Sequence, residues 1–407
     1  MNRRWEIARY AYENVALYRE RCEKNSDIKK MLELEKWESI PLVEKKDIVF
    51  SGCKVISDEY IGQYALGKLL KTHTSGTAGI SVDTYWTKQD YYCSLLPLWI
   101  QRWKNAGIHP KDKVCFFNTV LPDNKNYLYE KNTLIISKSN MTRERLRKSY
   151  ELMRKFEPKW LLLHPSMAMM LCEIVEKEKL PAIPTLVYME LTGEMFLESQ
   201  RVRLEKLFSC IVKSHYGAME VNSMGYEEEK GKYRLFETAA YVEILDDNGK
   251  VLKNGEEGNI YVTSLHNYAM PFIRYGIGDC GKIVTECDGG KESRILQLSD
   301  TRKNDLFYLE EGAGIPPDGL LKPVDIINSM EDYAVYQFRA VQVEYRTIEI
   351  YAILNGDFDK QSFMNHYMKL LEPAFSKGIQ YRFIFQDEDM FPDKITGKLG
   401  WFESKCK

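Results

Sequence analysis

"WLLLHPSMAMMLCEIVEKE" (residues 160–178) decides the fold class, because it joins a short buried strand to a helix. Residues 160–166 predict the strand, which ends at Pro165, and residues 167–178 predict the helix. The same alternation continues on both sides, with strands predicted at 113–120, 133–139 and 185–191 and helices at 142–156 and 197–208. Strands that alternate with helices of about 10–15 residues predict a parallel sheet covered by helices, and therefore an α/β fold.

The N-terminal third is predicted to be mainly helical. Residues 1–35 and 87–106 predict helices, and a further helix is expected to start near Lys45, after the break at Pro41. The aromatic residues around the second of these helices are expected to lie in the core; they include Trp86, Tyr92 and Trp103.

The C-terminal half shows a different pattern of predicted elements. From about residue 233, short β segments and turn signals such as "DDNGK" (246–250) predict antiparallel or barrel-like sheet. Beyond Asp305, a Gly/Pro-rich stretch leads into a small α+β unit, with strands predicted at 336–345, 348–354 and 381–386 and a helix at 360–371. We therefore predict two domains: a large multi-sheet domain over residues 1–301 and a small α+β domain over residues 302–407.

The composition argues against several classes of protein. The 407 residues carry a formal net charge of −2, whereas nucleic-acid binders usually show a basic excess. No apolar run approaches the ~18 residues that a membrane span needs, and the basic N-terminus lacks the apolar segment of a secretory signal. Nine scattered cysteines without a CxxC pair fit free thiols, so we expect a soluble cytoplasmic protein.

The stretch "KTHTSGTAGISVDTYW" (71–86) contains a loop rich in hydroxyl groups and glycine. Small residues let the backbone approach an anion closely, so Thr74 to Gly79 could wrap a polyphosphate. A polar surface turn is the alternative, and for the loop alone it is favoured. A second glycine-rich run, "GIGDCG" (276–281), matches GxGxxG but leads into a β-like run instead of a helix, which argues against a dinucleotide site.

Four further stretches follow the loop in sequence. They are "SHYGAMEVNS" (214–223), in which Glu220 opens a new segment; "MPFIRYGIGDCGKI" (270–283), expected to end a strand with Arg274 and Asp279; "TRKNDLFYLEEG" (301–312); and "DKITGKLGWF" (393–402). With the loop, and in this order, they resemble the adenylate-forming (AMP-binding) enzyme superfamily. The most similar branch holds the phenylacetate–CoA ligases and the capsule-biosynthesis and coenzyme-synthetase-like proteins, and "RYAYENVALYRERC" (9–22) and "IPLVEKKDIV" (40–49) also look like that branch.

The resemblance implies a nucleotide site and a fold: the large N-terminal domain of acyl-adenylate synthetases plus a small mobile C-terminal domain. Its phosphate loop falls on Thr74, Ser75, Gly76, Thr77 and Gly79, its adenine-lining turn on Gly193 and Glu194, and its Y-G-x-T-E motif on Tyr216, Gly217 and Glu220. Tyr216 is then expected near adenine, Asp279 at the ribose hydroxyls and Arg302 at ribose or phosphate. Glu220 is the expected Mg²⁺ ligand, Asp305 the hinge, and Lys398 the catalytic lysine, with Thr77 also expected to act in catalysis.

Several positions depart from the family pattern. Ser81 and Val82 stand where the family has proline and lysine, Met219 replaces a threonine, Gly276 an arginine, and Thr301 the hinge glycine. We expect these changes to alter the contacts to the phosphates. They should therefore affect the rate of the reaction more than the type of reaction.

The resemblance thus implies an ATP- and Mg²⁺-dependent ligase that converts a small carboxylic acid, aromatic by analogy, into an acyl adenylate. The acyl group is then expected to pass to the thiol of CoA or of a carrier-protein phosphopantetheine. An amide-forming ligase with an amine acceptor, and a degenerate member that binds nucleotide without ligating, remain alternatives.

Overall fold

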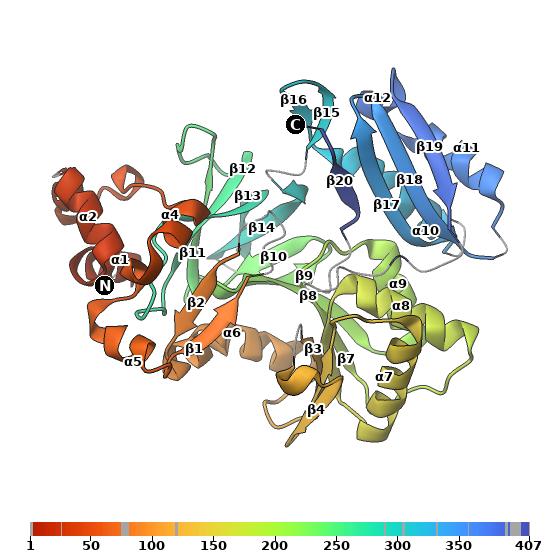
Figure 1. The fold of residues 1–407 in the computed structure, drawn as a ribbon, viewed down its shortest axis with the longest axis horizontal. Helices are drawn as coiled ribbons and strands as arrows, with labels where there is room; N and C mark the ends of the chain where they lie inside the picture. Colours follow the sequence, from red (N-terminus) through yellow and green to blue (C-terminus); the bar gives the residue numbers. More distant parts are fainter. Residues whose placement is uncertain are drawn as a thin grey trace. The chain divides into compact units, whose positions relative to one another are not determined.

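The computed structural model describes residues 3–25, 27–74, 81–118, 121–288, 290–302, 306–330, 333–356, 358–386, 390 and 400–406. Its contacts divide the chain into two compact units (Figure 1). The first unit comprises Met1–Asn105 and His215–Ser299, and the second comprises Ala106–Ser214 and Asp300–Lys407. Each unit is described by itself.

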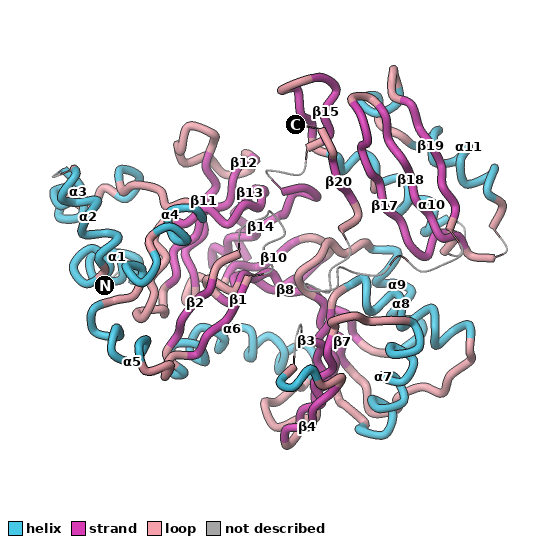
Figure 2. The backbone as a smooth tube through the Cα atoms, viewed as in Figure 1, coloured by secondary structure: helices cyan, strands magenta, loops and turns pink. Residues whose placement is uncertain are grey.

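Helices dominate the N-terminal part of the first unit, as Figure 2 shows. They are α1 (Arg3–Asn14), α2 (Ala16–Lys24), α3 (Asp27–Glu33), α4 (Lys45–Phe50), α5 (Ile61–Ala65) and α6 (Lys88–Ala106), with short 3₁₀ helices η1 (Trp37–Ser39), η2 (Gly52–Val55) and η3 (Asp58–Tyr60). The predicted helices at 1–35, near Lys45 and at 87–106 are confirmed. Strands β1 (Leu70–His73) and β2 (Asp83–Trp86) form a separate antiparallel hairpin.

An antiparallel sheet forms the rest of the first unit. Its strands are the C-terminal half of β8 (Ile211–Ala218), β9 (Asn222–Glu229), β10 (Lys232–Leu235), β11 (Ala240–Leu245), β12 (Glu257–Ser264), β13 (Tyr275–Asp288) and β14 (Lys291–Arg302), in the order β11-β12-β13-β14-β10-β9-β8. The predicted antiparallel sheet is confirmed, although the antiparallel pairing already begins with β9, before residue 233. The expectation that a strand ends with Arg274 and Asp279 is wrong, because β13 begins at Tyr275 and runs through Asp279.

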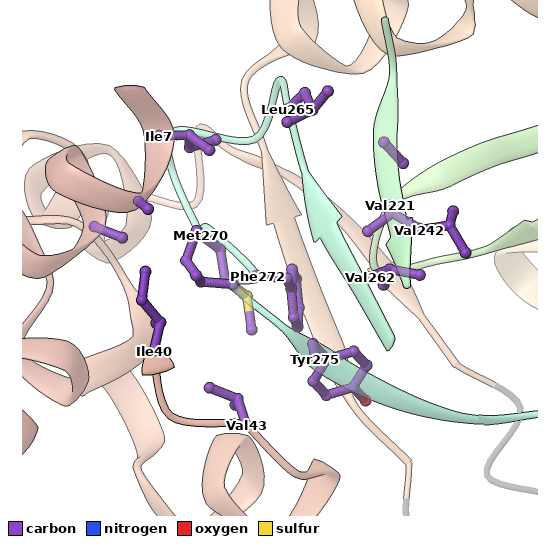
Figure 3. Packing of buried hydrophobic residues seen from close by; sticks show 14 of the residues in the cluster. Ile7, Ile40, Val43, Val221, Val242, Val262, Leu265, Met270, Phe272 and Tyr275 are labelled. Atoms are coloured by element: carbon purple, nitrogen blue, oxygen red, sulfur yellow. The ribbon is translucent and has the colours of Figure 1, made fainter. Parts of the chain in front are cut away.

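The core of the first unit lies between the N-terminal helices and this sheet. Figure 3 shows Ile40 and Val43 beside Met270 and Phe272, and all four belong to one buried cluster. The backbone joins the same segments, because Val43 N donates to Arg274 O and Gly276 N donates to Val43 O, at 3.0 and 2.9 Å. Residues near 40 are therefore fixed on the strand that carries Tyr275 and Asp279.

The second unit contains the parallel sheet that the alternating pattern predicts. β3 (Val114–Asn118), β5 (Thr133–Ser137), β6 (Trp160–Leu163), β7 (Tyr188–Leu191) and the start of β8 are parallel, and β4 (Tyr127–Glu130) pairs antiparallel with β5 at the edge. The order is β8-β7-β6-β3-β5-β4, with helices α7 (Arg143–Phe156), α8 (Pro165–Lys177) and α9 (Glu198–Phe208), and the 3₁₀ helix η4 (Pro122–Asn124). The α/β prediction is confirmed.

The C-terminal part of the second unit is a small α+β arrangement. Sheet β19-β18-β17-β20 is built from β17 (Val335–Glu344), β18 (Thr347–Leu354), β19 (Gln380–Phe385) and β20 (Phe402–Ser404). It is accompanied by α10 (Lys322–Met330), α11 (Lys360–Leu370), α12 (Pro373–Ser376), η5 (Pro317–Leu320) and the hairpin β15 (Phe307–Glu310) and β16 (Ala313–Ile315). These elements match the predicted strands and helix, and the division into domains at residue 302 stays a prediction.

Two general expectations can be compared with the described residues. All nine cysteines lie in the described part of the chain and are free thiols. Within that part, no helix has the length and apolarity that a membrane span requires.

Candidate functional site

The hairpin β1–β2 closes the predicted phosphate loop at its base. Thr74 N donates to Val82 O at 3.0 Å, and Val82 N donates to Thr74 Oγ1 at 2.8 Å. Both residues are buried, so the two ends of the loop are held together. Ser75, Gly76, Thr77 and Gly79 lie outside the described residues. Val82, at the position of the family's lysine, is only 2% exposed and brings no charge.

The hairpin is joined to the turn that carries Glu220. The hydroxyl groups of Thr72 and Thr84 contact each other across the two strands. Thr84 Oγ1 also donates to the backbone oxygen of Met219 at 3.1 Å. The base of the predicted phosphate loop therefore lies beside Glu220.

A tight turn between β8 and β9 fixes Glu220. The backbone bond from Val221 N to Ala218 O, 3.0 Å long, closes this turn. Gly217 is required here, because a Cβ at this position would lie 2.5 Å from Asn222 O. Asn222 Nδ2 donates to Ser94 Oγ of α6 at 2.7 Å, which anchors the far side of the turn. Glu220 therefore lies in a turn between two strands and does not begin a helix.

A bulge in β13 presents Asp279. The pairing with β12 shifts between Asn259 and Tyr261, whose partners are Cys280 and Gly276. Residues 277–279 are thus opposed by a single residue of β12. Gly278 has a φ of +87°, a conformation that favours glycine. Such bulges re-aim a side chain away from the regular pleat, and here the residue that follows Gly278 is Asp279.

Two tyrosine–carboxylate hydrogen bonds connect the Glu220 turn to β13. Tyr216 Oη donates to Asp279 Oδ2 at 2.8 Å, and Tyr275 Oη donates to Glu220 Oε1 at 3.0 Å. Each segment supplies one tyrosine and one carboxylate, and each tyrosine binds the carboxylate of the other segment. The structure therefore brings together Tyr216, Glu220 and Asp279, which the sequence assigned to one nucleotide site. The contribution of Tyr275 was not predicted.

The electrostatic environment of Glu220 suits a cation. Burial raises the pKa of this carboxyl group, which is 5% exposed, while the bond from Tyr275 and the charge of Lys45 oppose that rise. The negative charge of Asp279 adds to it. Mg²⁺ is commonly held by one or two carboxylates together with substrate phosphates, so a single buried carboxylate beside a phosphate loop fits this ion.

The predicted adenine-lining turn is fixed within the second unit. Gly193 has a φ of +83°, and Glu194 accepts hydrogen bonds from the backbone N and the Oγ of Ser166, both at 2.9 Å. This carboxylate therefore caps the N-terminal turn of α8.

A buried basic pair lies next to this turn and was not predicted. His164 Nδ1 lies 2.7 Å from Thr192 O, which makes it the donor, and Nε2 lies 2.5 Å from Lys138 Nζ. Lys138 and His164 follow β5 and β6, the strands on either side of β3. Polar residues after neighbouring parallel strands are the sequence signal that could have identified the pair.

Arg302, Asp305 and Lys398 are the remaining residues of the predicted site. The backbone of Arg302 ends β14, and Asp305 and Lys398 lie outside the described residues. Their assigned roles stay predictions.

Several proteins of known function resemble this chain over most of its length. No family model matches the chain. A phenylacetate-coenzyme A ligase of Pseudomonas putida is 23% identical over 378 residues, which is 87% of this chain and 80% of that protein. The Escherichia coli (strain K12) enzyme of the same name is 24% identical over 342 residues, covering 78% and 73% of the two chains.

The fold recurs in a solved structure of 2-hydroxyisobutyryl-CoA ligase in complex with 2-HIB-AMP. The TM-score is 0.75 at 17% identity, over 98% of this chain and 87% of that one. The resemblance to adenylate-forming enzymes of the phenylacetate–CoA ligase type is therefore confirmed, and the α/β fold is that of the acyl-CoA ligases.

Proposed function

We propose that this chain, whose fold is that of the adenylate-forming acid–CoA ligases, activates a carboxylic acid with ATP and passes the acyl group to the thiol of CoA. The observation that carries the proposal is the pair of crossed hydrogen bonds, Tyr216 to Asp279 and Tyr275 to Glu220, beside the base of a phosphate-type loop. It supports a site that holds two carboxylates in fixed orientations, one toward ribose hydroxyls and one toward a phosphate-bound cation.

The first half-reaction makes one bond and breaks one. An oxygen of the substrate carboxylate attacks the α-phosphorus of ATP, and the bond from that phosphorus to pyrophosphate breaks. Negative charge grows on the phosphate oxygens, so nearby donors and cations stabilise the transition state, typically by a few kcal/mol each. Mg²⁺ held by Glu220 and the phosphates would supply part of that positive charge.

The other residues of the site would orient the nucleotide. Asp279 is suited to accept hydrogen bonds from the ribose diol, because its carboxylate is already oriented by Tyr216. The ring of Tyr216 would lie against adenine. The backbone N–H groups of residues 75–79 would bind the phosphates, and Gly193 and Glu194 would line the adenine pocket.

The second half-reaction is attack of a thiol on the carbonyl carbon of the acyl adenylate, with AMP leaving. We propose that Lys398 serves adenylation only and that residues 302–407 move about Asp305 between the two steps, with Arg302 contacting ribose or phosphate. An aromatic acid is supported by the relatives named phenylacetate-coenzyme A ligase. A carrier-protein phosphopantetheine presents the same thiol as CoA and is the second acceptor to test.

ATP–pyrophosphate exchange with a panel of benzoates, phenylacetates, fatty acids and amino acids tests the proposal. We expect an aromatic acid to drive exchange and CoA to yield its thioester. Exchange driven only by another class of acid would overturn the aromatic assignment. Amide formation with an amine acceptor would overturn the thiol assignment. ATP binding without exchange for any acid would contradict catalysis and favour a non-ligating nucleotide binder.

Lys398→Ala separates the two half-reactions. It should suppress exchange by roughly a hundredfold or more, while transfer from a supplied acyl adenylate continues. Equal loss in both assays would contradict a role limited to adenylation.

A further inference from the structure

Arg274, the residue before Tyr275, has an unusual backbone conformation. Its φ is +47°, in the left-handed region that residues other than glycine adopt infrequently. Such a conformation persists only where the surrounding contacts impose it, and it is found preferentially at functional sites. The next residue, Tyr275, donates its hydroxyl to the Glu220 carboxylate at 3.0 Å. The contacts that hold Arg274 therefore bear on the position of Glu220.

The guanidinium of Arg274 is fully buried and joins two segments of the first unit. Its Nη1 contacts three backbone oxygens of one N-terminal stretch, Trp37 O at 3.3 Å, Glu38 O at 2.8 Å and Ile40 O at 2.7 Å. Its Nε and Nη2 each donate to one carboxylate oxygen of Glu243 on β11, both at 3.3 Å. A planar, forked donor is held in one orientation by such a set of acceptors, whereas an ammonium group would not be.

The backbone around Arg274 is fixed as well. Arg274 N donates to Thr263 Oγ1 of β12 at 3.0 Å, and Val43 N donates to Arg274 O at 3.0 Å. One residue earlier, Ile273 N donates to Tyr18 Oη of α2 at 3.2 Å. Side chain and backbone of Arg274 together therefore hold the chain in one path where it enters β13.

The ring of Tyr275 leaves its hydroxyl little freedom (Figure 3). The ring packs edge to face against Phe272, with ring centres 5.0 Å apart and planes at 65°, and the side chain is buried. Because a ring enclosed in this way cannot swing, the position of the hydroxyl follows the backbone at residues 274 and 275. A displacement of that backbone would move the hydroxyl away from Glu220.

We propose that Arg274 is a positioning residue for the proposed Mg²⁺ ligand. Its buried guanidinium holds the left-handed conformation at the start of β13, which sets the Tyr275 hydroxyl against the Glu220 carboxylate. Partners that orient a metal ligand typically affect metal affinity by roughly 10–100-fold when they are lost. This inference rests on the proposed function for the identity of the ion and the nucleotide. The alternative is a purely structural role, in which the ion pair with Glu243 only stabilises the fold.

Binding of Mn²⁺–ATP to the full chain, followed by the electron paramagnetic resonance of the manganese ion, separates the two roles. Arg274→Lys keeps the charge but loses the fork, and it should lower the affinity roughly three- to tenfold. Tyr275→Phe deletes the donor to Glu220 and should lower the affinity roughly tenfold. The double variant should bind within about twofold of Tyr275→Phe alone, because Arg274 acts through that hydroxyl.

Ile7→Ala, a cavity-forming change on α1 in the same buried cluster, is the matched control. It should lower the melting temperature, as the loss of a core side chain does, and leave the Mn²⁺–ATP affinity within about twofold of the wild type. If Arg274→Lys does not fold, Glu243→Gln supplies the comparison, because it weakens the same fork while keeping the shape of the side chain.

Each contrary outcome has one meaning. Wild-type affinity in Arg274→Lys overturns the proposal, and so does a wild-type protein that does not bind Mn²⁺–ATP. Losses that add in the double variant, or an equal loss in Ile7→Ala, show a structural role and overturn it too. If no acid drives pyrophosphate exchange while the double variant still shows the coupling, the ligase function fails and the positioning role stands.

Discussion

The hydroxyl of Tyr216 donates a hydrogen bond to Oδ2 of Asp279, 2.8 Å away and 63 positions along the chain. The bond holds the carboxylate in one orientation. A group that is oriented in advance costs less conformational entropy on binding than one that must be ordered by its ligand.

Removing only this hydroxyl should weaken nucleotide binding. Tyr216→Phe keeps the ring and deletes the donor, so we expect the KM for ATP to rise by about three- to tenfold while kcat changes less. Steady-state exchange kinetics at saturating acid measure both constants. Tyr351→Phe removes a tyrosine–carboxylate bond elsewhere in the fold and serves as the control. A fall in kcat at constant KM would contradict a binding role.

Removing the carboxylate itself should have a larger effect. Asp279→Ala deletes the proposed ribose ligand, and we expect exchange to fall by roughly a hundredfold or more. Asp123→Ala, at a position whose side chain is exposed, should retain wild-type activity. If the Asp279 variant exchanges pyrophosphate at the wild-type rate, the assignment of the nucleotide site is wrong.

Neutralising Glu220 should separate metal binding from folding. Glu220→Gln keeps the shape of the side chain and its bond to Tyr275, and we expect the Mg²⁺ concentration for half-maximal exchange to rise at least roughly tenfold. Because burial disfavours the charged carboxylate, the variant should melt at the same temperature as the wild type or higher. Direct Mn²⁺ titration followed by electron paramagnetic resonance gives a readout independent of turnover. Unchanged metal affinity would exclude Glu220 as the ligand.

His266 should make stability depend on pH outside the site. Its Nδ1 accepts a hydrogen bond from Arg3 Nη2 at 3.1 Å, and its Nε2 donates one to Thr238 O at 2.9 Å. A neutral ring with its proton on Nε2 makes both bonds. Burial, and then the charge of Arg3, lower its pKa below 6.5. The stability contributed by the neutral ring is present above pH 6.5 and is lost as the pH falls through the lowered pKa. Urea unfolding at pH 7 and pH 5 should show a larger loss for the wild type than for His266→Gln; equal losses would contradict this.

Arg203 should stabilise the second unit. Its guanidinium lies 4.1 Å from the ring centre of Tyr333 and 4.6 Å from that of Tyr336, and it pairs with Glu176. Arg203→Ala removes both kinds of contact, so we expect the free energy of unfolding to fall by about 2 kcal/mol, less than for a fully buried pair because Glu176 is partly exposed. Chemical denaturation measures the loss, with the exposed Arg382→Ala as control. A loss equal to that of the control would contradict a packing role.

The sequence predicted the parallel sheet well because its signal is local. β6 and α8 are each specified by the pattern of a few neighbouring residues. The same pattern does not tell which face of a helix is covered. Trp86 is buried as predicted, but Tyr92 and Trp103 of α6 are 64% and 55% exposed, so their assignment to the core is wrong.

The candidate site could be predicted only as a set of residue types in a characteristic order. Glu220 and Asp279 were recognised from their motifs, but their tyrosine partners depend on a bulge in β13 and a turn after β8. Those features arise from strand pairing between distant segments, which no local pattern encodes.

The distance along the chain between these partners has a kinetic consequence. Glu44 and Tyr261 are 217 positions apart, and Tyr18 binds the backbone of Pro271 across 253 positions. At synthesis rates of about 5–20 residues per second, the N-terminal helices would wait roughly ten seconds or longer on the ribosome before the strands that cover them emerge. Contacts of such high sequence separation form slowly, so the apolar faces of α1, α2 and α4 should depend on chaperones during translation and aggregate when the chain is truncated before β13.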